Sequence, residues 1–284
     1  RHTLTPIQKA FFESAIPAAH HWNQSVLLRP VAELIDAEKL QQALALLVSQ
    51  HDALRLGFNR DGMGWYGEYS TRDQEILWQI PVADETHLTA EANRAQRSLD
   101  LANGPLLRAV LFALPDGGQR LLLAIHHLVI DGVSWRILLE DLQQVYRQLK
   151  QGQPAVLAPK TTAFSSWSDK LQAYAKSPEL LQEVDYWLGS AEETRELPRD
   201  NPAGGQQNKH ARQVSTRLDQ QLTQQLLKQA PAAYRTQVND LLLTALARVI
   251  CRWTGAASTL VTLEGHGRED LFNGVDLTRT LGWF

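Results

Sequence analysis

Residues 120–135 read RLLLAIHHLVIDGVSW, an apolar run that leads directly into two histidines, an aspartate and a glycine. The apolar run has the composition of a buried strand, whereas after Gly132 the spacing of the apolar residues changes to that of a helix. The stretch therefore predicts a central strand, a short polar loop and the start of a helix. Because polar residues gather where the strand ends, the loop is a candidate functional site.

The flanking sequence extends this prediction to a sheet. Residues 106–114 and 120–128 are two apolar runs, and the glycines of the intervening Pro-Asp-Gly-Gly segment allow the positive φ of a tight hairpin. In the helix that follows, Ser134 can cap the start and Gly152 can end it. Its apolar stripe consists of Trp135, Leu138, Leu139, Leu142, Tyr146 and Leu149.

Further elements are predicted on both sides of this unit. A helix over residues 36–50 can be capped by Asp36, another starts at Pro178, and an apolar stripe predicts a long packed helix over residues 238–253 that Gly255 ends. A strand is expected over residues 259–263. The polar segment 194–210, with two prolines and two glycines, is predicted to be a linker.

Composition and charge exclude several functional classes. The 284 residues are 44% apolar and 21% charged, which is typical of a soluble globular protein. The net charge is −3 and the 28 basic residues are scattered, so neither a nucleic acid nor a membrane surface is an expected partner. A single cysteine, Cys251, allows no internal disulfide. The sequence shows no signal peptide and no membrane-spanning run, so the expected location is the cytoplasm.

The two histidines invite three interpretations. Imidazole can gain or lose a proton near neutral pH, and neighbours on a strand point to opposite faces, so one of His126 and His127 is expected to be structural and the other catalytic. Asp131 is expected to accept backbone N–H groups or pair with an arginine, and Gly132 to permit a tight turn. The alternatives are two satisfied core histidines and a zinc site. Adjacent histidines do not readily face one ion and no third ligand stands at a standard spacing, so we predict no metal.

A second candidate site is EGHGRE, residues 264–269, which follows the predicted strand. A partly buried Glu264 carboxylate would be suited to proton abstraction, whereas the alternative is a solvated surface turn. Each candidate site ends an apolar strand, and the two stand on opposite sides of the predicted linker. A cleft between two lobes, with a histidine from one and a glutamate from the other, would suit two-base chemistry.

These segments resemble a known family. HHLVIDGVSW resembles the HHxxxDG motif of the condensation-domain superfamily of nonribosomal peptide synthetases, in the form with Ser-Trp after the glycine that is typical of epimerization domains. EGHGRE resembles the signature that separates epimerization domains from condensing ones. Three further segments resemble family motifs: TPIQ at 5–8 with Phe11-Phe12, WNQS at 22–25 and LGWF at 281–284. The resemblance runs from residue 5 to the last residue.

The resemblance implies an α/β (α+β) fold like that of chloramphenicol acetyltransferase. Two lobes, each a mixed sheet flanked by helices, would form a V with the active site in a tunnel between them. We expect an N-terminal lobe over residues 1–176 and a linker with part of the C-terminal lobe over residues 177–284. Complete members continue past the Gly-Trp-Phe motif, so the C-terminal lobe is expected to be incomplete.

The resemblance also implies the site residues. His127 and Glu264 would be the acid/base pair, with Glu264 preferred as the base and His127 as proton donor or enolate stabiliser. Asp131 would pair with an arginine, for which Arg279 is the expected partner, and Trp135 is interpreted as packing. The supporting residues are His126, Asp131, Gly132, Ser134, Trp135, His266, Arg268 and Arg279.

The implied activity is epimerization, L to D, at the α-carbon of an aminoacyl or peptidyl thioester carried on the phosphopantetheine of a peptidyl carrier protein. No bound cofactor is expected. The expected partners are that carrier protein and a downstream condensation domain, with this chain as a monomeric domain of a large synthetase of peptide antibiotics. One alternative is a condensing domain that uses the same His127, and Ser134-Trp135 and EGHGRE disfavour it. The other is a noncatalytic carrier-docking module.

Overall fold

The computed structural model describes residues 1–70, 74–189, 196–205 and 207–284. These residues form two compact units: unit 1 comprises Arg1–Ser177 with Gly265–Phe284, and unit 2 comprises Pro178–Glu264. The C-terminal segment that follows Glu264 thus belongs to the same unit as the HHLVIDG loop. The expected lobe boundaries, 1–176 and 177–284, stay a prediction.

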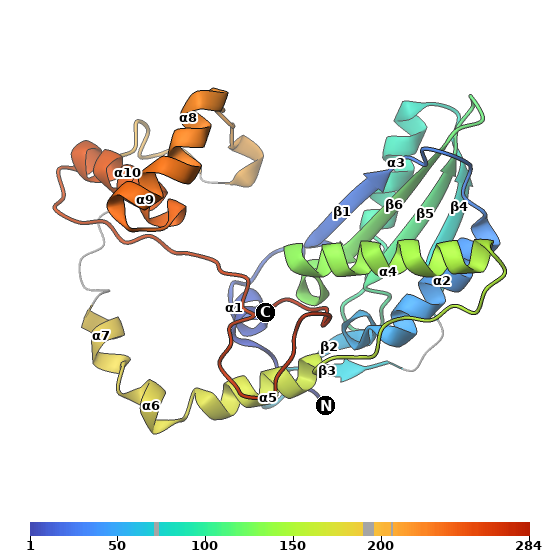
Figure 1. The fold of residues 1–284 in the computed structure, drawn as a ribbon, viewed down its shortest axis with the longest axis horizontal. Helices are drawn as coiled ribbons and strands as arrows, with labels where there is room; N and C mark the ends of the chain where they lie inside the picture. Colours follow the sequence, from blue (N-terminus) through green and yellow to red (C-terminus); the bar gives the residue numbers. More distant parts are fainter. Residues whose placement is uncertain (71–73, 190–195, 206) are drawn as a thin grey trace. The chain divides into compact units, whose positions relative to one another are not determined.

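Unit 1 is built on a four-stranded mixed sheet (Figure 1). Its strand order is β1 (Asn23–Leu28), β6 (Gln119–His126), β5 (Leu107–Ala113) and β4 (Leu77–Pro81). The β1–β6 and β6–β5 pairs are antiparallel and the β5–β4 pair is parallel. The predicted hairpin of β5 and β6 is confirmed. Its second strand ends at His126, two residues before the predicted end, because the chain turns there into a short 3-10 helix, His127–Val129.

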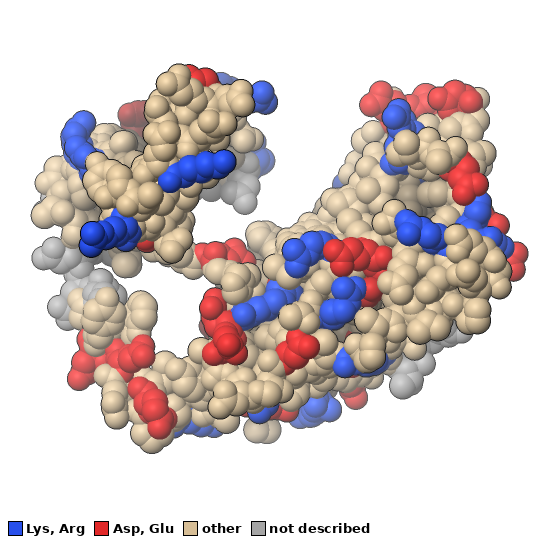
Figure 2. All heavy atoms as spheres, in the orientation of Figure 1, with Lys and Arg blue, Asp and Glu red and all other residues tan. Residues whose placement is uncertain are grey.

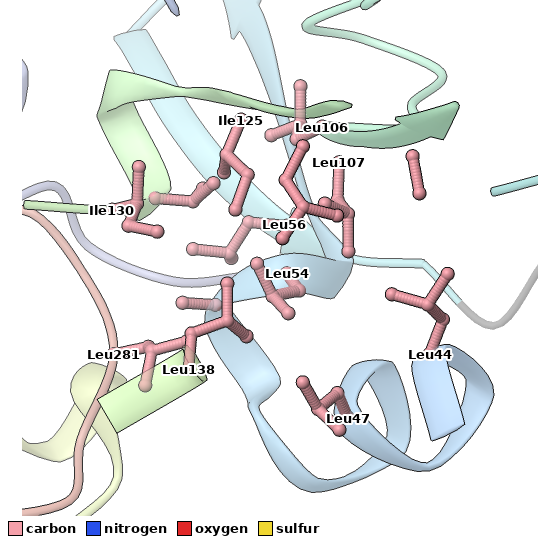
Figure 3. Close-up of a cluster of buried hydrophobic side chains, with 14 of the residues drawn as sticks. Leu44, Leu47, Leu54, Leu56, Leu106, Leu107, Ile125, Ile130, Leu138 and Leu281 are labelled. Atoms are coloured by element: carbon pink, nitrogen blue, oxygen red, sulfur yellow. The ribbon is translucent and has the colours of Figure 1, made fainter. Parts of the chain in front are cut away.

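Helices cover both faces of this sheet. The helices α2 (Ala37–Gln50) and α4 (Gly132–Lys150) contribute to one apolar cluster with the sheet, and α3 (Glu85–Gln96) contributes to a second cluster. Successive residues of β5 alternate between the two clusters, as the period of two in a strand requires. Figure 3 shows the larger cluster around Leu44, Leu47, Leu54, Leu56, Leu106, Leu107, Ile125, Ile130, Leu138 and Leu281. Its last member, Leu281, comes from the C-terminal segment.

The remaining elements of unit 1 also contribute side chains to the larger cluster. They are α1 (Pro6–Glu13), the antiparallel pair β2 (Leu56–Asp61) and β3 (Gly64–Tyr69), α5 (Phe164–Tyr174), and two short 3-10 helices, Ala19–His21 and Asp52–Arg55. The predicted helix at 36–50 is confirmed, and the Asp36 side chain accepts hydrogen bonds from the backbone N–H groups of Glu38 and Lys39.

The start of α4 differs from the prediction in one respect. Asp131 caps this helix by accepting the backbone N–H of Ser134 at 2.7 Å, so Ser134 is not the cap. An aspartate one residue before the first helical position can reach the N–H three residues on, whereas Ser134 already lies within the first turn. The predicted C-terminal signal is confirmed, because Gly152 follows the helix with φ of +68°.

Unit 2 consists of helices and irregular segments in its described residues. The helices are α6 (Pro178–Leu181), α7 (Val184–Gly189), α8 (Gln220–Gln224), a π-helical turn (Gln225–Gln229), α9 (Ala230–Tyr234) and α10 (Val238–Thr254), with a 3-10 turn at Asn208–His210. The helix starting at Pro178 and the long helix ended by Gly255, with φ of +69°, are confirmed. Part of the predicted linker 194–210 lies outside the described residues.

Two predictions for unit 2 are wrong. The expected strand over residues 259–263 does not form, since both sheets lie in unit 1 and no neighbouring strand in the described part of unit 2 offers backbone partners. The helix α10 has the predicted apolar stripe, but none of its residues is fully buried. Leu242 and Trp253 are 51% and 58% exposed. Periodicity identified the helix and not the surface that would cover it.

Charged side chains of both signs are interspersed on the face drawn in Figure 2, as the sequence predicts. In the described part of the chain, no helix combines the length and the apolar character needed to cross a membrane.

Candidate active site

The HHLVIDG loop is held at the edge where β6 meets α4. β6 ends at His126, the 3-10 helix His127–Val129 follows, and Asp131 caps α4. The buried Gln8 of α1 donates its side-chain N–H to the backbone carbonyl of Leu128 at 2.9 Å. The TPIQ segment therefore supports the HHLVIDG loop, although 120 residues separate Gln8 from Leu128.

His126 is a structural residue. Its side chain is fully buried, Nε2 donates to the carbonyl of Ala19 at 2.7 Å, and Nδ1 accepts the backbone N–H of Leu128 at 3.2 Å. Burial lowers the pKa of His126 from 6.5 to about 4, so the ring is neutral at neutral pH. Both ring nitrogens are thus engaged within the core and not directed at a substrate.

His127 has different surroundings. It is half-buried, and its ring stacks on the indole of Trp283 with centroids 4.1 Å apart and an angle of 26° between the planes. Nδ1 lies 2.8 Å from the carbonyl oxygen of Ile130, and Nε2 lies 2.9 Å from the side-chain nitrogen of Gln24. The expectation that the two histidines have separate tasks agrees with these contacts.

Sequence reasoning missed the role of Gln24 and part of the role of Trp135. The indole Nε1 of Trp135 donates to Oε1 of Gln24 at 2.7 Å, so Trp135, Gln24 and His127 form a continuous hydrogen-bonded row. Gln24 lies opposite Ile125 on the neighbouring strand, two residues from His127. Gln24 belongs to the WNQS segment that the sequence analysis singled out. Only the β1–β6 register shows that its side chain reaches His127.

Asp131 and Arg268 join the two motifs. Oδ2 of Asp131 lies 2.5 Å from Nη1 of Arg268, and the two side chains are 13% and 8% exposed. Arg268 also donates through Nη2 to the hydroxyl of Ser134 at 2.9 Å and to the carbonyl of Thr280 at 3.2 Å. Its guanidinium lies 3.9 Å from the ring centre of Phe284. Arg268 therefore helps to anchor the C-terminal segment to the loop.

The expected pairing of Asp131 with Arg279 is wrong. Arg279 instead forms ion pairs with Asp141 and, at 3.3 Å, with Glu140, both on α4. Asp141 in turn binds Nε2 of the buried His51 at 2.8 Å. Arg279 lies eleven residues after Arg268, and sequence order alone does not show which of the two reaches Asp131.

Ser134 connects three segments in the core of unit 1. Its hydroxyl receives the Arg268 hydrogen bond, accepts the backbone N–H of Gly282 at 3.1 Å, and lies 3.1 Å from the carbonyl of the same residue. The side chain is fully buried. The HHLVIDGVSW, EGHGRE and LGWF segments thus meet at Ser134 and Asp131, which the sequence had marked only as supporting residues.

Two glycines of the site have different constraints. A Cβ added to Gly132 would meet no atom of the described residues within 4 Å, and Gly132 has no positive φ, so the expected steric reason for this glycine is wrong. Gly267 has φ of +67°, and a Cβ there would overlap the backbone carbonyl group of Phe284. Close approach of two backbones requires glycine at 267 and not at 132.

Glu264 and His266 differ from this buried network in their exposure. Glu264 is the last residue of unit 2 and is exposed, so the predicted partial burial of its carboxylate is not found. His266 is exposed, accepts the backbone N–H of Arg268 at 3.0 Å, and lies 3.8 Å from the carboxylate of Glu269. Among the residues with a described position, no three histidine, cysteine or acidic side chains gather as metal ligands would.

Comparison with known proteins gives consistent matches over the whole chain. The model of the condensation domain family matches residues 1–284. The chain is 43% identical over 291 residues to surfactin synthase subunit 1 of Bacillus subtilis, and 41% identical over 289 residues to tyrocidine synthase 2 of Brevibacillus parabrevis. Each of these alignments covers 99% of this chain but 8% of the relative. The chain therefore corresponds to a small part of each relative.

Solved structures show the same fold. The epimerization domain from the third module of tyrocidine synthetase B matches with a TM-score of 0.89 and 39% identity, over 100% of this chain and 66% of that one. The first condensation domain of the calcium-dependent antibiotic synthetase matches with a TM-score of 0.71 at 22% identity, over 100% of this chain and 66% of that one. This chain spans about two thirds of each solved domain.

Proposed function

This chain belongs to the condensation domain family, and on that premise we propose that it epimerizes the α-carbon of an aminoacyl or peptidyl thioester from L to D. The observation that carries the proposal is the similarity to a solved epimerization domain, which is closer in identity and in TM-score than that to the solved condensation domain. The Asp131–Arg268 ion pair supports it, because it connects the HHLVIDG loop to the EGHGRE segment that resembles the epimerization signature.

The substrate in this proposal is a thioester on the phosphopantetheine of a peptidyl carrier protein. The relatives are synthetases many times longer than this chain, which supports a domain that works beside a carrier protein and a condensation domain. A bound cofactor is not needed for the chemistry, since the thioester itself makes the α-proton acidic. We place the protein in the cytoplasm, where nonribosomal peptides would be assembled.

His127 and Glu264 are the acid/base pair of the proposed reaction. One group removes the α-proton, the electron pair moves into the thioester carbonyl as an enolate, and a group on the other face returns a proton. The Trp283 indole and the Ile130 carbonyl orient the His127 ring. Each positioned acid or base contributes on the order of a hundredfold to ten-thousandfold in rate.

The test is deuterium uptake at the α-carbon of a carrier-bound aminoacyl thioester in heavy water, followed by hydrolysis and chiral analysis. His127→Ala and Glu264→Ala are each expected to abolish uptake and D/L mixing. The matched controls are His87→Ala and Glu85→Ala, which replace exposed residues of α3 and are expected to retain both.

The remaining outcomes separate the alternatives. The chain is compared with a version that spans the full length of the solved epimerization domain, of which this chain covers 66%. Amide formation between two carrier-bound substrates, without α-proton exchange, would identify a condensing domain. Carrier binding with neither reaction in both versions would identify a docking module, and either result would overturn the proposal.

A further inference from the structure

The contacts of the His127 ring determine which of its nitrogens carries a proton. Nδ1 lies 2.8 Å from the carbonyl oxygen of Ile130. A carbonyl oxygen accepts hydrogen bonds and cannot donate them, so Nδ1 must carry a hydrogen for this contact to be a hydrogen bond. A neutral imidazole has one N–H, which leaves Nε2 as the acceptor.

An independent constraint reaches Nε2 from the opposite side. The indole N–H of Trp135 is a donor only, so the Gln24 atom that faces it at 2.7 Å must be the amide oxygen. The amide NH2 of Gln24 then faces Nε2 of His127 at 2.9 Å. Because NH2 can only donate, Nε2 must accept. The two constraints share no atom and give the same tautomer.

We infer that Gln24 and Trp135 are positioning residues that hold the neutral His127 ring in one tautomer, with its proton on Nδ1 and an unprotonated Nε2. A proton on Nε2 would point at the Gln24 NH2 group, and rotating the amide to present its oxygen would turn the NH2 toward the Trp135 indole N–H. Either arrangement places two donors against each other and leaves a hydrogen bond unmade. Gln24 contacts Nε2 and Trp135 contacts Gln24, so the row acts through the imidazole ring.

In the described part of unit 1, the hydrogen-bond and stacking partners of this ring are uncharged. Gln24 on β1, Ile130 in the loop and Trp283 in the C-terminal segment are neutral. The adjacent His126 is the titratable neighbour, and burial lowers its pKa to about 4, so it too is neutral at neutral pH.

The inference rests on the proposed function when it is applied to catalysis. An unprotonated Nε2 suits His127 to accept the α-proton, opposite to the role preferred from sequence. Because this nitrogen has one lone pair, the Gln24 NH2 must turn away from Nε2 as the proton binds there. The Cα–H bond breaks, its electron pair enters the thioester carbonyl, and the proton forms the Nε2–H bond of an imidazolium. A protonated group on the opposite face then gives its proton to the α-carbon, and both groups return to their starting states by exchange with water.

The test of the tautomer needs no substrate. The ring nitrogens of the chain labelled with 15N-histidine are observed by NMR at neutral pH, and the His127 signals are assigned by their loss in His127→Gln. We expect a protonated Nδ1 and an unprotonated Nε2. In Gln24→Glu the carboxylate can only accept, so His127 is expected to carry protons on both nitrogens. In Trp135→Phe the amide is free to rotate while the Ile130 carbonyl still holds the Nδ1 proton, so a mixture of rings with and without a proton on Nε2 is expected.

A matched control and a second variant keep the result decisive. Trp78→Phe removes another indole N–H, one that donates to Glu75 at 3.0 Å, and should leave the His127 signals unchanged. Gln24→Met fills similar space without polar atoms, and should release Nε2 without adding charge. A protonated Nε2 in the unmodified chain, or unchanged His127 signals in both Gln24→Glu and Trp135→Phe, would overturn the inference.

The rate of α-deuterium uptake tests whether the His127 tautomer matters for the proposed reaction. Gln24→Glu is expected to slow α-deuterium uptake by about tenfold to a hundredfold at saturating thioester, with KM changed less than about twofold, because a base is lost and not a binding contact. If the unmodified chain exchanges no α-proton, the proposed function fails while the NMR result still decides the tautomer. Unchanged uptake in a Gln24→Glu variant with altered ring signals would instead overturn the catalytic role alone.

Discussion

The carboxylate of Asp131 and the guanidinium of Arg268 form an ion pair at 2.5 Å that spans 137 residues of sequence. Asp131 uses its other oxygen to cap α4, and Arg268 uses its second Nη nitrogen to bind Ser134 and Thr280. Both side chains are nearly excluded from solvent. This pair therefore links the HHLVIDG loop, the start of a helix and the C-terminal segment.

Arg268→Ala is expected to destabilise unit 1 by about 3 to 5 kcal/mol, because it leaves the Asp131 carboxylate buried without its partner. Urea denaturation followed by circular dichroism measures this loss. Arg94→Ala is the control, since Arg94 forms an exposed ion pair with Glu91 on α3 and its loss should cost less than about 1 kcal/mol. Equal effects of the two substitutions would contradict the assigned role of Arg268.

The buried histidines should make stability depend on pH. Burial lowers the pKa of His126 and of His2 from 6.5 to about 4, so below pH 6.5 the unfolded chain binds protons that the folded chain does not. The free energy of unfolding is therefore expected to fall as pH drops from 6.5 toward 4, by about 3 kcal/mol in total for each histidine and about 2 kcal/mol of that by pH 5. Above pH 6.5 this contribution is fully present.

Denaturant titrations at pH 7 and pH 5 measure that slope. His126→Asn should reduce the stability at pH 7 and also reduce the difference between the two pH values. The carboxylates with lowered pKa values, such as Asp36 and Asp52, lose their contribution at lower pH than the histidines and should not obscure it. A slope that is the same in His126→Asn and in the unmodified chain would refute the assignment.

The two glycines of the site predict opposite responses to alanine. Gly132→Ala is expected to change stability by less than about 1 kcal/mol, because a Cβ meets open space and the backbone needs no positive φ. Gly267→Ala should cost more than that, because φ is +67° and the Cβ would overlap the Phe284 backbone. Thermal melts of the two variants test the comparison. Equal melting temperatures would show that the approach of Phe284 to Gly267 is not required.

Trp283 should matter for both packing and the orientation of His127. Its side chain is 8% exposed and stacks on the imidazole at 4.1 Å. Trp283→Ala is expected to cost about 3 to 5 kcal/mol through the cavity it leaves. Trp283→Phe keeps an aromatic face and should cost less. Retained stability together with reduced α-proton exchange in Trp283→Phe would support an orienting role, whereas full exchange would count against it.

Local patterns were read correctly where local forces decide the structure. The period of the apolar residues and the capping signals predicted α2, the β5–β6 hairpin, α4 and α10, each within about two residues. The predicted strand over 259–263 failed because a strand needs a neighbour that supplies hydrogen bonds, and that requirement is not local. The predicted packing of α10 failed for the related reason that an apolar stripe does not specify what covers it.

The sequence by itself determined the helices and strands with strong periodicity, the family resemblance and the separation of the two histidines into different environments. Only the tertiary structure decided that Arg268 and not Arg279 meets Asp131, and that Gln24 and Trp135 reach His127. Capping and periodicity act over a few residues, so they can be read along the chain. Ion pairs and proton positions depend on which side chains come within about 3 Å, and strand register and packing set those distances between segments up to 278 residues apart.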